Sequence, residues 1–541
     1  MKRLLLLFTL AFVAMSCEEL QDFIDTKGHG LVFLEGEMKA YFPDNGDTKN
    51  YKFNADLAWS ATVSAEWVEV DPASGEAGEN KIQIKVDKNK SNERRTGYVD
   101  ITLSNDKSYR IELVQLATSE SLDDITPSVS IPNNEIWYTS ADGNIVEPYS
   151  GEASQDNFAV FGANIVSNTF DAEKECWVIK FDGDVTSVGS FAFYECSSIV
   201  NMTIPESVTS IGYAAFYNCS SLTSITIPDS VTAIGGYAFN GCSSLISITI
   251  PDNVTTIEGY AFFECSSLTS VTIPDSLTSI GDSAFSLCSS LTSVTIGDSV
   301  TAIGECAFWV CSSLTSVTIP DSVTTIGDAA FARCSNLREF NGKYVSKDGR
   351  CLIFNGTLNS FAPAGLTEYT IPDGVTNIGQ NAFDWCSSLT SITIGDGVTT
   401  IGTWAFGDCS SLTSVTIPDS VTTIDVNAFC NCSGLTSVTI PDSVTTIGYG
   451  VFVNCSSLTS VTISNSVTTI GEAAFAWCEC LTSVYCKAVI PPTVNIFDGD
   501  WSAFYNNAPD RKIYVPTESV EVYKSATGWS DYADAIVGYD F

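Results

Sequence analysis

The sequence contains little positive charge and a single histidine. Lys and Arg number 25 against 64 for Asp and Glu, so the 541-residue chain carries a formal charge of −39 at pH 7. So acidic a chain repels nucleic acids and anionic membrane surfaces, and neither is an expected partner. Because His29 is the only histidine, Ser-His-Asp and Cys-His catalysis are excluded from the long repeated region that follows it.

Other signatures of chemistry are also missing. The sequence has no P-loop and no dinucleotide-binding glycine motif, and it has no CxxC pair that would suggest zinc. We therefore expect no cofactor and no metal, and we expect that the protein is not an enzyme. Acidic residues are numerous enough to leave a glycosidase-type carboxylate pair open. A glycosidase or a protease is the least favoured function.

No apolar stretch is long enough to span a bilayer, which requires about 20 residues. The apolar residues 4–13 follow Lys2 and Arg3 and precede small residues, which indicates an export signal. Cys17 comes next, followed by two Glu. This arrangement resembles a bacterial lipoprotein signal, and its acidic end resembles the export tag of Bacteroidetes surface lipoproteins.

The lipoprotein resemblance implies a signal peptide at 1–16, a lipid on Cys17 and a tether at 17–29. It places the protein at the outer membrane or cell surface, with membrane contact only through the lipid anchor. An ordinary cleaved signal followed by an incidental cysteine is the alternative.

A 23-residue repeat dominates the chain. Its marker is a phenylalanine that recurs twelve times at this spacing, with one interruption after the seventh copy. The marker residues are Phe193, Phe216, Phe239, Phe262, Phe285, Phe308, Phe331, Phe383, Phe406, Phe429, Phe452 and Phe475. A fixed period over many copies is typical of a solenoid, in which each unit buries its apolar side against its neighbours.

The copy at 222–244 shows how one coil is built. Apolar and polar residues alternate around Ile225 and Ile227, which predicts a short strand with both isoleucines inward. Pro228 ends this strand because it cannot donate to a ladder. The apolar spacing around Phe239 suits one helical or 3₁₀ turn on the outer side. Strands of successive coils are predicted to stack into a parallel sheet, about 4.8 Å apart.

The repeat reads L-T-S-V-T-I-P-D-S-V-T-T-I-G-x-x-A-F-x-x-C-S-S and resembles the short repeat of BspA-like leucine-rich-repeat surface proteins. The copy at 412–434 follows it, except that Asp425 replaces the Gly and Gly434 the last Ser. The resemblance covers roughly residues 180–486. It implies a surface protein that attaches to host matrix proteins, other cells or glycans, with no catalysis by the repeats.

Residues 30–117 have a different sequence pattern from the repeats. Strand-like runs at 81–86, 98–103 and 111–116, separated by Gly and Pro, indicate a β-sandwich. This segment resembles a BACON domain, an immunoglobulin-like module of Bacteroidetes surface proteins, which implies either sugar binding or a spacer role. The resemblance rests on Trp59, Trp67, Asn89, Arg94, Arg95, Gly97, Gln115 and the turn at 72–78.

The fold class is therefore mainly β with short helical or 3₁₀ turns. An N-terminal immunoglobulin-like β-sandwich is followed by a leucine-rich-repeat solenoid with caps, since an uncapped end coil would expose its core. The remaining segments are a linker at 118–134, an N-terminal cap with the first coil at 135–192, the repeats at 193–486 with an irregular repeat at 337–370, and a C-terminal cap at 487–541.

Two further repeated positions are predicted to belong to the scaffold. Twelve of the 19 cysteines stand three residues after the marker phenylalanine, where their side chains point the same way, so buried free thiols are favoured over disulfides. Local pairing stays open at Cys306, Cys430 and Cys480. An aspartate that recurs after Pro or Gly suits a turn, with Ca²⁺ binding by this row as the alternative.

Binding specificity is expected where the copies differ. Aromatic residues at variable positions beside the marker phenylalanine can stack on sugars or anchor a protein, and packing between coils is the alternative. Basic residues of the irregular repeat would attract an acidic ligand, unless they only solvate a loop. The candidate binding residues are Trp309, Trp385, Trp404, Trp477, Tyr449, Arg338, Lys343, Lys347 and Arg350.

The predicted function is that of a cell-surface lipoprotein that acts as a non-catalytic binding or adhesion scaffold through its solenoid. Its partners would be host matrix or cell-surface proteins, or glycans. The alternative is a glycan-capture protein associated with a polysaccharide-uptake system.

Overall fold

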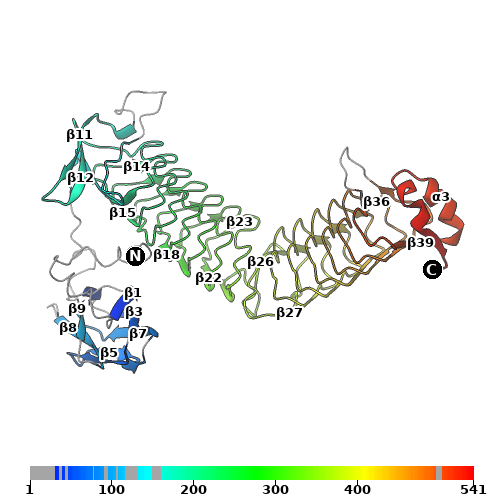
Figure 1. The fold of residues 1–541 in the computed structure, drawn as a ribbon, viewed down its shortest axis with the longest axis horizontal. Coiled ribbons are helices and arrows are strands. Elements are labelled where there is room, and N and C mark those ends of the chain that lie inside the picture. Colours follow the sequence, from blue (N-terminus) through cyan, green and yellow to red (C-terminus); the bar gives the residue numbers. More distant parts are fainter. Residues whose placement is uncertain are drawn as a thin grey trace. The chain divides into compact units, whose positions relative to one another are not determined.

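The computed structural model describes residues 31–35, 39–42, 47–55, 57–76, 78–90, 95–104, 108–115, 131–148, 160–494 and 502–541. The chain forms two compact units, Met1–Ser130 and Ile131–Phe541 (Figure 1). The predicted signal peptide, Cys17 and most of the predicted linker lie outside the described residues. Among the helices that are described, none is long and apolar enough to cross a membrane.

The first unit is a sandwich of two β-sheets. One sheet has the order β1-β3-β7-β5 and the other β2-β9-β8-β4-β6. Ile82 and Ile84 of the first sheet and Val99 and Ile101 of the second are buried in one shared core. The strands are β1 (Leu31–Glu35), β2 (Lys39–Phe42), β3 (Asp47–Ala55), β4 (Trp59–Val63), β5 (Val68–Asp71), β6 (Ser74–Gly75), β7 (Gly78–Val86), β8 (Arg95–Leu103) and β9 (Ser108–Gln115).

The residues that carry the BACON resemblance support this sandwich. Gln115 is fully buried. It accepts a hydrogen bond from Arg95 Nε (2.7 Å) and donates one to the Asp87 carbonyl (2.8 Å). The Arg95 guanidinium lies 4.4 Å from the centre of the Trp67 ring, and a Cβ at Gly97 would come within 3.1 Å of the same ring. These contacts explain Trp67, Arg95, Gly97 and Gln115 by packing within the sandwich, and Arg94 lies outside the described residues.

The second unit begins with a cap that turns antiparallel pairing into parallel stacking. The cap strands are β10 (Glu135–Ser140), β11 (Ile165–Asp171) and β12 (Cys176–Phe181), in a sheet of order β11-β12-β10-β13-β15. β10 pairs antiparallel with β13, the first strand of the coils, and β13 pairs parallel with β15. The open end of the first coil is thereby covered.

Most coils contribute short strands to two parallel ladders, in which residues 23 apart are usually partners, such as Val271 with Val294 and Ile234 with Ile257. The coil that begins at Leu245 joins the first ladder only through an isolated bridge from Ser247 to Ser270. The first ladder contains β13 (Ile199–Thr203), β15 (Ser224–Thr226), β18 (Ser270–Thr272), β20 (Ser293–Thr295), β22 (Ser316–Ile319), β24 (Glu339–Gly342), β27 (Glu368–Thr370), β29 (Ser391–Thr393), β31 (Ser414–Thr416), β33 (Ser437–Ile440), β35 (Ser460–Ile463) and β37 (Ser483–Cys486). The second contains β14 (Ser210–Ile211), β16 (Ala233–Ile234), β17 (Thr256–Ile257), β19 (Ser279–Ile280), β21 (Ala302–Ile303), β23 (Thr325–Ile326), β28 (Asn377–Ile378), β30 (Thr400–Ile401), β32 (Thr423–Ile424), β34 (Thr446–Ile447), β36 (Thr469–Ile470) and β38 (Thr493–Val494).

The outer side of each coil is a pair of tight turns around the marker phenylalanine. In the coil of Phe308, the amide of Cys311 donates to the Phe308 carbonyl, an i→i−3 bond like that of a 3₁₀ turn. However, Cys306 and Val310, two residues before and two after the phenylalanine, have φ of 54° and 59°. Left-handed residues at these two places interrupt the expected helical turn, so no regular helix forms.

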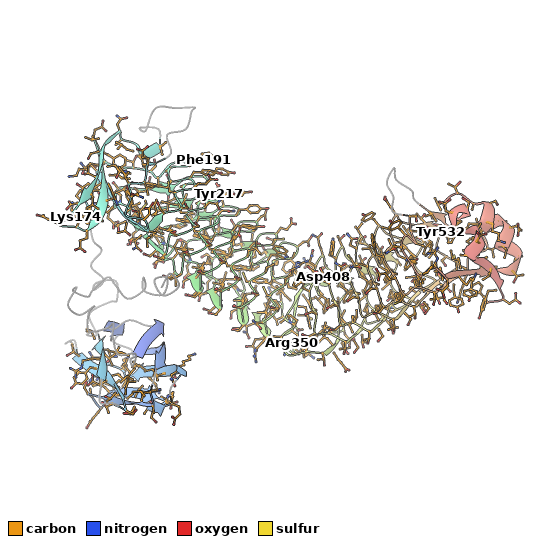
Figure 2. The ribbon with its side chains drawn as sticks, in the orientation of Figure 1. Lys174, Phe191, Tyr217, Arg350, Asp408 and Tyr532 are labelled. Carbon is orange, nitrogen blue, oxygen red and sulfur yellow. The ribbon has the colours of Figure 1, made fainter. Side chains whose placement is uncertain are left out.

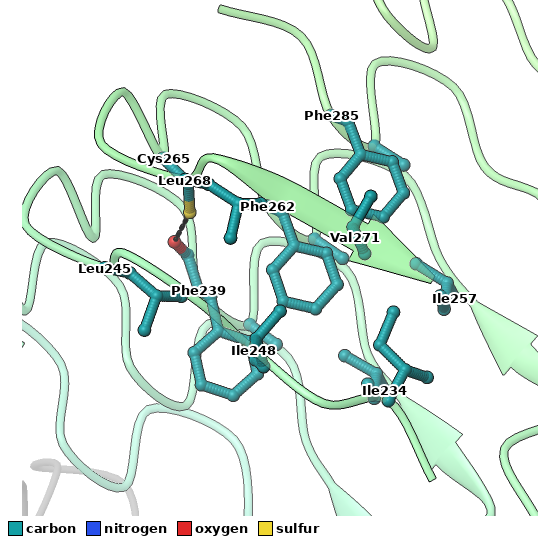
Figure 3. Close-up of a cluster of buried hydrophobic side chains, with 14 of the residues drawn as sticks. Ile234, Phe239, Leu245, Ile248, Ile257, Phe262, Cys265, Leu268, Val271 and Phe285 are labelled. Atoms are coloured by element: carbon teal, nitrogen blue, oxygen red, sulfur yellow. Dashed lines mark hydrogen bonds between the residues drawn. The ribbon is translucent and has the colours of Figure 1, made fainter. Parts of the chain in front are cut away.

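The core consists of ladders of identical side chains (Figure 3). The rings of Phe239, Phe262 and Phe285 are 5.2 and 5.1 Å apart and nearly parallel. The Cys265 thiol donates to the Phe239 carbonyl of the preceding coil (3.2 Å), and nine other ladder cysteines make the equivalent bond. All 18 cysteines within the described residues are free, which agrees with the predicted ladder of buried thiols.

The C-terminal cap continues both ladders and then closes them. Phe504 stacks on Phe475 at 5.5 Å as a further rung. Tyr523 and Trp529 are fully buried, and they donate to the carbonyls of Ala488 (2.7 Å) and Pro492 (2.8 Å). The cap elements are β39 (Lys512–Pro516), η2 (Thr517–Ser519), α3 (Val520–Ser525), η3 (Ser530–Ala535) and β40 (Ile536–Tyr539).

Candidate functional site

The irregular repeat breaks the array into two stacks. Two core clusters meet there, one ending with Leu352 and Ala362 and the other beginning with Cys351, Leu358 and Phe361. β24 and β27 belong to different sheets, as do β15 and β18, β20 and β22, and β31 and β33 of the same ladder. The sequence between β24 and β27 forms a hairpin with an antiparallel bridge from Val345 to Leu352, and a second hairpin of β25 (Cys351–Phe354) and β26 (Thr357–Phe361).

The four basic candidates of this repeat divide into two groups. Arg338, Lys343 and Lys347 are exposed. Arg350 is half-buried, and its Nη1 donates to the carbonyls of Ala362 (3.1 Å) and Ala364 (2.9 Å). Arg350 therefore holds the hairpin against the following segment, and the other three side chains face solvent. Arg350 is labelled in Figure 2.

On the outer turns beside the break, an arginine lies between two of the predicted tryptophans. The Arg333 guanidinium carbon is 5.3 Å from the centre of the Trp309 ring and 4.8 Å from that of the Trp385 ring. The position is two residues after a marker phenylalanine, where the backbone is left-handed (φ 61°). Trp385 is 53% exposed and Trp309 is half-buried. We call this group the Trp-Arg-Trp cluster.

Two aspartates from the second stack fix this arginine. Arg333 Nε lies 2.5 Å from Asp384 Oδ2, and Nη2 lies 3.4 Å from Asp408 Oδ2. The Asp408 carboxylate also accepts bonds from Trp385 Nε1 (2.8 Å) and Asn431 Nδ2 (2.9 Å). Since Arg333 belongs to the first stack and the aspartates to the second, these bonds join the two stacks. Asp408 is labelled in Figure 2.

Burial dominates the electrostatics of Asp384. Its side chain is fully buried, and Oδ1 has no hydrogen-bond partner. Burial raises the pKa of this carboxyl above its ordinary value, although Arg333 and a bond from Asn381 act in the opposite direction. Arg333 lies beside the carboxylate and offsets the free-energy cost of burying its charge. The arginine is therefore held in one place.

The sequence did not single out Arg333 as a binding residue. It lies 51 residues before Asp384. Because this spacing is not a multiple of 23, the repeat does not predict that the two residues are neighbours. The available signal was a basic residue at a turn position just before the interruption, directly after residues 182–332, which contain no Lys or Arg.

The other predicted aromatic residues lie in coils beyond the break. Trp404 is half-buried, and its ring approaches Gly407, where a Cβ would come within 2.6 Å of it. Tyr449 is 45% exposed. Trp477 packs edge-on against Tyr505 at 5.5 Å. Tyr449 and Trp477 belong to the coils of Phe452 and Phe475, so they are not part of the Trp-Arg-Trp cluster.

The repeated aspartates, such as Asp275 and Asp298, are exposed on turns, and the Asp298 amide donates to Asp275 Oδ1 (2.8 Å). In the part of the chain that is described, no three potential metal ligands of the His, Cys, Asp or Glu type come together. A polar pocket of about 340 Å³ opens beside β27, lined by Asp348, Glu368, Tyr369, Thr370, Ser391 and Thr393.

Two family models match this chain. The BspA type leucine rich repeat region matches in six copies, at 163–270, 256–348 and 357–482, which together make up more than half of the chain. The viral BACON domain matches residues 46–118. No curated protein sequence matches.

Several solved structures are similar to this chain. A leucine rich cell surface protein from Faecalibacterium prausnitzii A2-165 is 36% identical, covers 56% of this chain and 83% of its own, and has a TM-score of 0.50. A leucine-rich repeat protein from Bacteroides ovatus is 31% identical over 61% of this chain and 88% of its own, with a TM-score of 0.41. The pneumococcal vaccine antigen PcpA, at 21% identity, covers 67% of this chain and 94% of its own with a TM-score of 0.51, and shares the fold alone.

The family matches and the Faecalibacterium structure confirm the predicted fold class and the resemblances to BspA-like repeats and to a BACON domain. With a BACON-like domain before a capped 23-residue solenoid, the chain belongs to the BspA type leucine-rich-repeat family of bacterial proteins.

Proposed function

We propose that this protein is a non-catalytic adhesion scaffold of the cell surface and that its solenoid binds a host matrix or cell-surface protein through the Trp-Arg-Trp cluster. The observation that carries the proposal is the sandwich of Arg333 between Trp309 and Trp385. Trp and Arg are enriched among residues that dominate protein interfaces. Here they are already ordered by two carboxylates, so binding would require little further loss of side-chain entropy.

The proposed location rests on the N-terminal sequence and on a relative. The lipoprotein-like signal with Cys17 favours an anchor at the outer membrane, and the Faecalibacterium relative is described as a cell surface protein. The lipid would hold the chain at the membrane, and the first unit would act as a spacer, because Trp67, Arg95 and Gln115 are engaged in its own packing.

Binding to a panel of immobilised matrix proteins tests the proposal. The full chain should bind at least one of them, and Trp385→Ala should weaken that binding about 30-fold, which corresponds to the roughly 2 kcal/mol of an interface hot spot. Trp385→Phe should recover part of the loss, because a phenyl ring can still cover the guanidinium.

The control is Ile490→Ser, which changes a side chain that is 81% exposed in the C-terminal cap and should leave binding unchanged. Thermal unfolding of each variant separates loss of binding from loss of fold. Undiminished binding by Trp385→Ala, or turnover of a substrate by the purified chain, would rule the proposal out.

Glycan capture is the second candidate, favoured by the polar pocket beside β27. Its hydroxyl and carboxylate groups, from residues such as Tyr369, Thr393 and Glu368, are of the kind that hydrogen-bond sugars. A glycan array probed with the full chain and with Glu368→Gln distinguishes this function from protein adhesion. A glycan signal that is lost in Glu368→Gln and kept in Trp385→Ala would assign glycan capture to the pocket.

A further inference from the structure

A continuous row of aromatic side chains covers the outer turns of the first four coils, far in sequence from the Trp-Arg-Trp cluster. We call it the tyrosine stripe, and it consists of Phe191, Tyr194, Tyr213, Tyr217, Tyr237 and Tyr260. Phe191 and Tyr213 are 37% and 46% exposed, and the other four are half-buried. Figure 2 shows Phe191 and Tyr217 along the same side of these coils.

The stripe is held together by ring contacts from coil to coil. Phe191 touches both Tyr194 (5.6 Å between ring centres) and Tyr213 (5.5 Å). One column continues from Tyr213 to Tyr237 (5.4 Å) and on to Tyr260 (4.7 Å). The other pairs Tyr194 with Tyr217 at 4.9 Å. Such a contiguous surface of exposed rings is typical of an interaction site.

The coil does not need these rings. Phe191, Tyr237 and Tyr260 stand two residues before the marker phenylalanine, with φ of 62°, 58° and 62°. Bulky side chains are strained in this left-handed region, which glycine and asparagine tolerate. Most other coils use small or Asn side chains at the same place, as at Ala214, Ser283, Cys306, Asn381, Asn427 and Gly450, and Trp404 is the one other aromatic residue at this position. Three of the first four coils therefore keep strained aromatic residues where smaller ones serve the fold, and such strain points to function.

Ring geometry indicates what the stripe presents. Tyr194 with Tyr217, and Tyr237 with Tyr260, are stacked within 6° of parallel. The facing surfaces of each pair are thus covered by each other, and a sugar ring cannot stack on them. Edges and phenol hydroxyls remain, which suit apolar stems and hydrogen-bond donors of a protein.

The charge around the stripe is of one sign. Residues 182–332 contain no Lys, Arg or His. Exposed carboxylates border the stripe at Glu195, next to Tyr194, and at Glu258, whose Oε2 accepts a bond from the Gly236 amide (2.8 Å) beside Tyr237. Lys and Arg side chains complement this surface, because their stems cover ring edges and their charged ends reach the carboxylates.

We propose that the tyrosine stripe is a docking surface for an extended, Lys- and Arg-rich segment of the partner protein. This inference rests on the proposed function, since it describes a second contact of the same adhesion scaffold. It places the recognition of the partner's positive charge in the first coils and away from the interruption.

The test is a selection of random 12-residue peptides on the full chain, followed by affinity measurement with the peptides obtained. The selected peptides should be enriched in Lys and Arg, and their affinity should fall as NaCl rises. The double variant Tyr237→Asn, Tyr260→Asn should lower the affinity at least tenfold. Asparagine is chosen because it accepts the left-handed backbone, so the variant keeps the coil.

Tyr539→Ser is the matched control, because Tyr539 lies in the C-terminal cap and is 43% exposed, close to the 46% of Tyr213. It should bind the peptides as the unaltered chain does. Selection of no peptide, of peptides without a Lys and Arg excess, or of peptides that bind the double variant equally well would overturn the inference. If the double variant binds the matrix protein normally and Trp385→Ala does not, the stripe is refuted and the proposed adhesion function stands.

Discussion

At the scale of the residue, the repeat places two left-handed residues in every coil, and the copies fill these places in different ways. Two residues after the marker phenylalanine, the chain has Asn218, Asn431 and Asn454, which suit this backbone, but also Val310 and Leu287, with φ of 59° and 61°. A β-branched side chain in this region is strained. The repeat therefore contains strain that its own sequence relieves in other copies.

Val310→Asn is expected to stabilise the protein by about 1 kcal/mol, because asparagine removes the conflict between the branched Cβ and a positive φ. Urea unfolding monitored by circular dichroism measures the change. Asn218→Val, at the equivalent place in another coil, is the reverse substitution and should lose a similar amount. A destabilising Val310→Asn would show that the valine side chain contributes more by packing than it loses by strain.

At the scale of the element, the turn after each marker phenylalanine forms a ladder of thiols whose bonds run between coils. Eleven of the twelve ladder cysteines are buried, and ten of them donate to a phenylalanine carbonyl of the preceding coil, as Cys265 does to Phe239. Burial raises the pKa of the Cys288 thiol to about 12 and that of Cys196 to about 11. Because the thiolate is the reactive form, these cysteines are protected in the folded chain.

Among the described cysteines, Cys480 is therefore expected to react first with a maleimide at pH 8, since it is exposed. Cys196 and Cys306, which are partly exposed, should follow slowly, and the eleven buried cysteines of the ladder should react only after denaturation. Mass spectrometry of peptides after timed labelling gives the order. Cys480→Ser should remove the fast event. Labelling of Cys288 in the native chain at the rate of Cys480 would contradict the ladder.

The alternation of apolar and polar residues and the 23-residue period were sufficient to predict which side chains fill the interior of a coil. Ile225 and Ile227, expected inward, are both 7% exposed, because the period of a strand determines which side chains share a face. The left-handed turns were not predicted. Ala, Phe and Cys at helical spacing suggest a helix, whereas the backbone of each turn is determined by hydrogen bonds to the next coil, such as Phe308 to the Ala330 carbonyl.

At the scale of the whole molecule, the second unit is two stacks in series, joined where the repeat is broken. The sequence predicted the break and two of the tryptophans beside it, and it could not predict that Arg333 would reach Asp384 and Asp408. Those contacts depend on how the irregular repeat closes on itself, which is a long-range property without a period. The ion pair between Arg333 of the first stack and the buried Asp384 of the second stack also lies at this junction.

Asp384→Asn tests that junction through its pH dependence. A carboxyl whose pKa is raised by folding binds its proton more tightly in the folded state. The wild-type chain therefore loses stability relative to the always-neutral amide as pH rises through that pKa. The urea midpoint of the variant minus that of the wild type should increase between pH 3 and pH 7. The value at pH 3, where the aspartate is protonated, is the internal control, and a difference that falls with pH would contradict the assignment.

The pairing of residues 23 apart also has a mechanical consequence. Hydrogen bonds between coils, such as those of Val271 with Val294, run along the direction in which the coils are stacked. Tension applied to the two ends of the array would break these hydrogen bonds one coil at a time. Each detached coil would release roughly 80 Å of extended chain. A molecule under load would thus lengthen in small steps while the coils still stacked keep their shape.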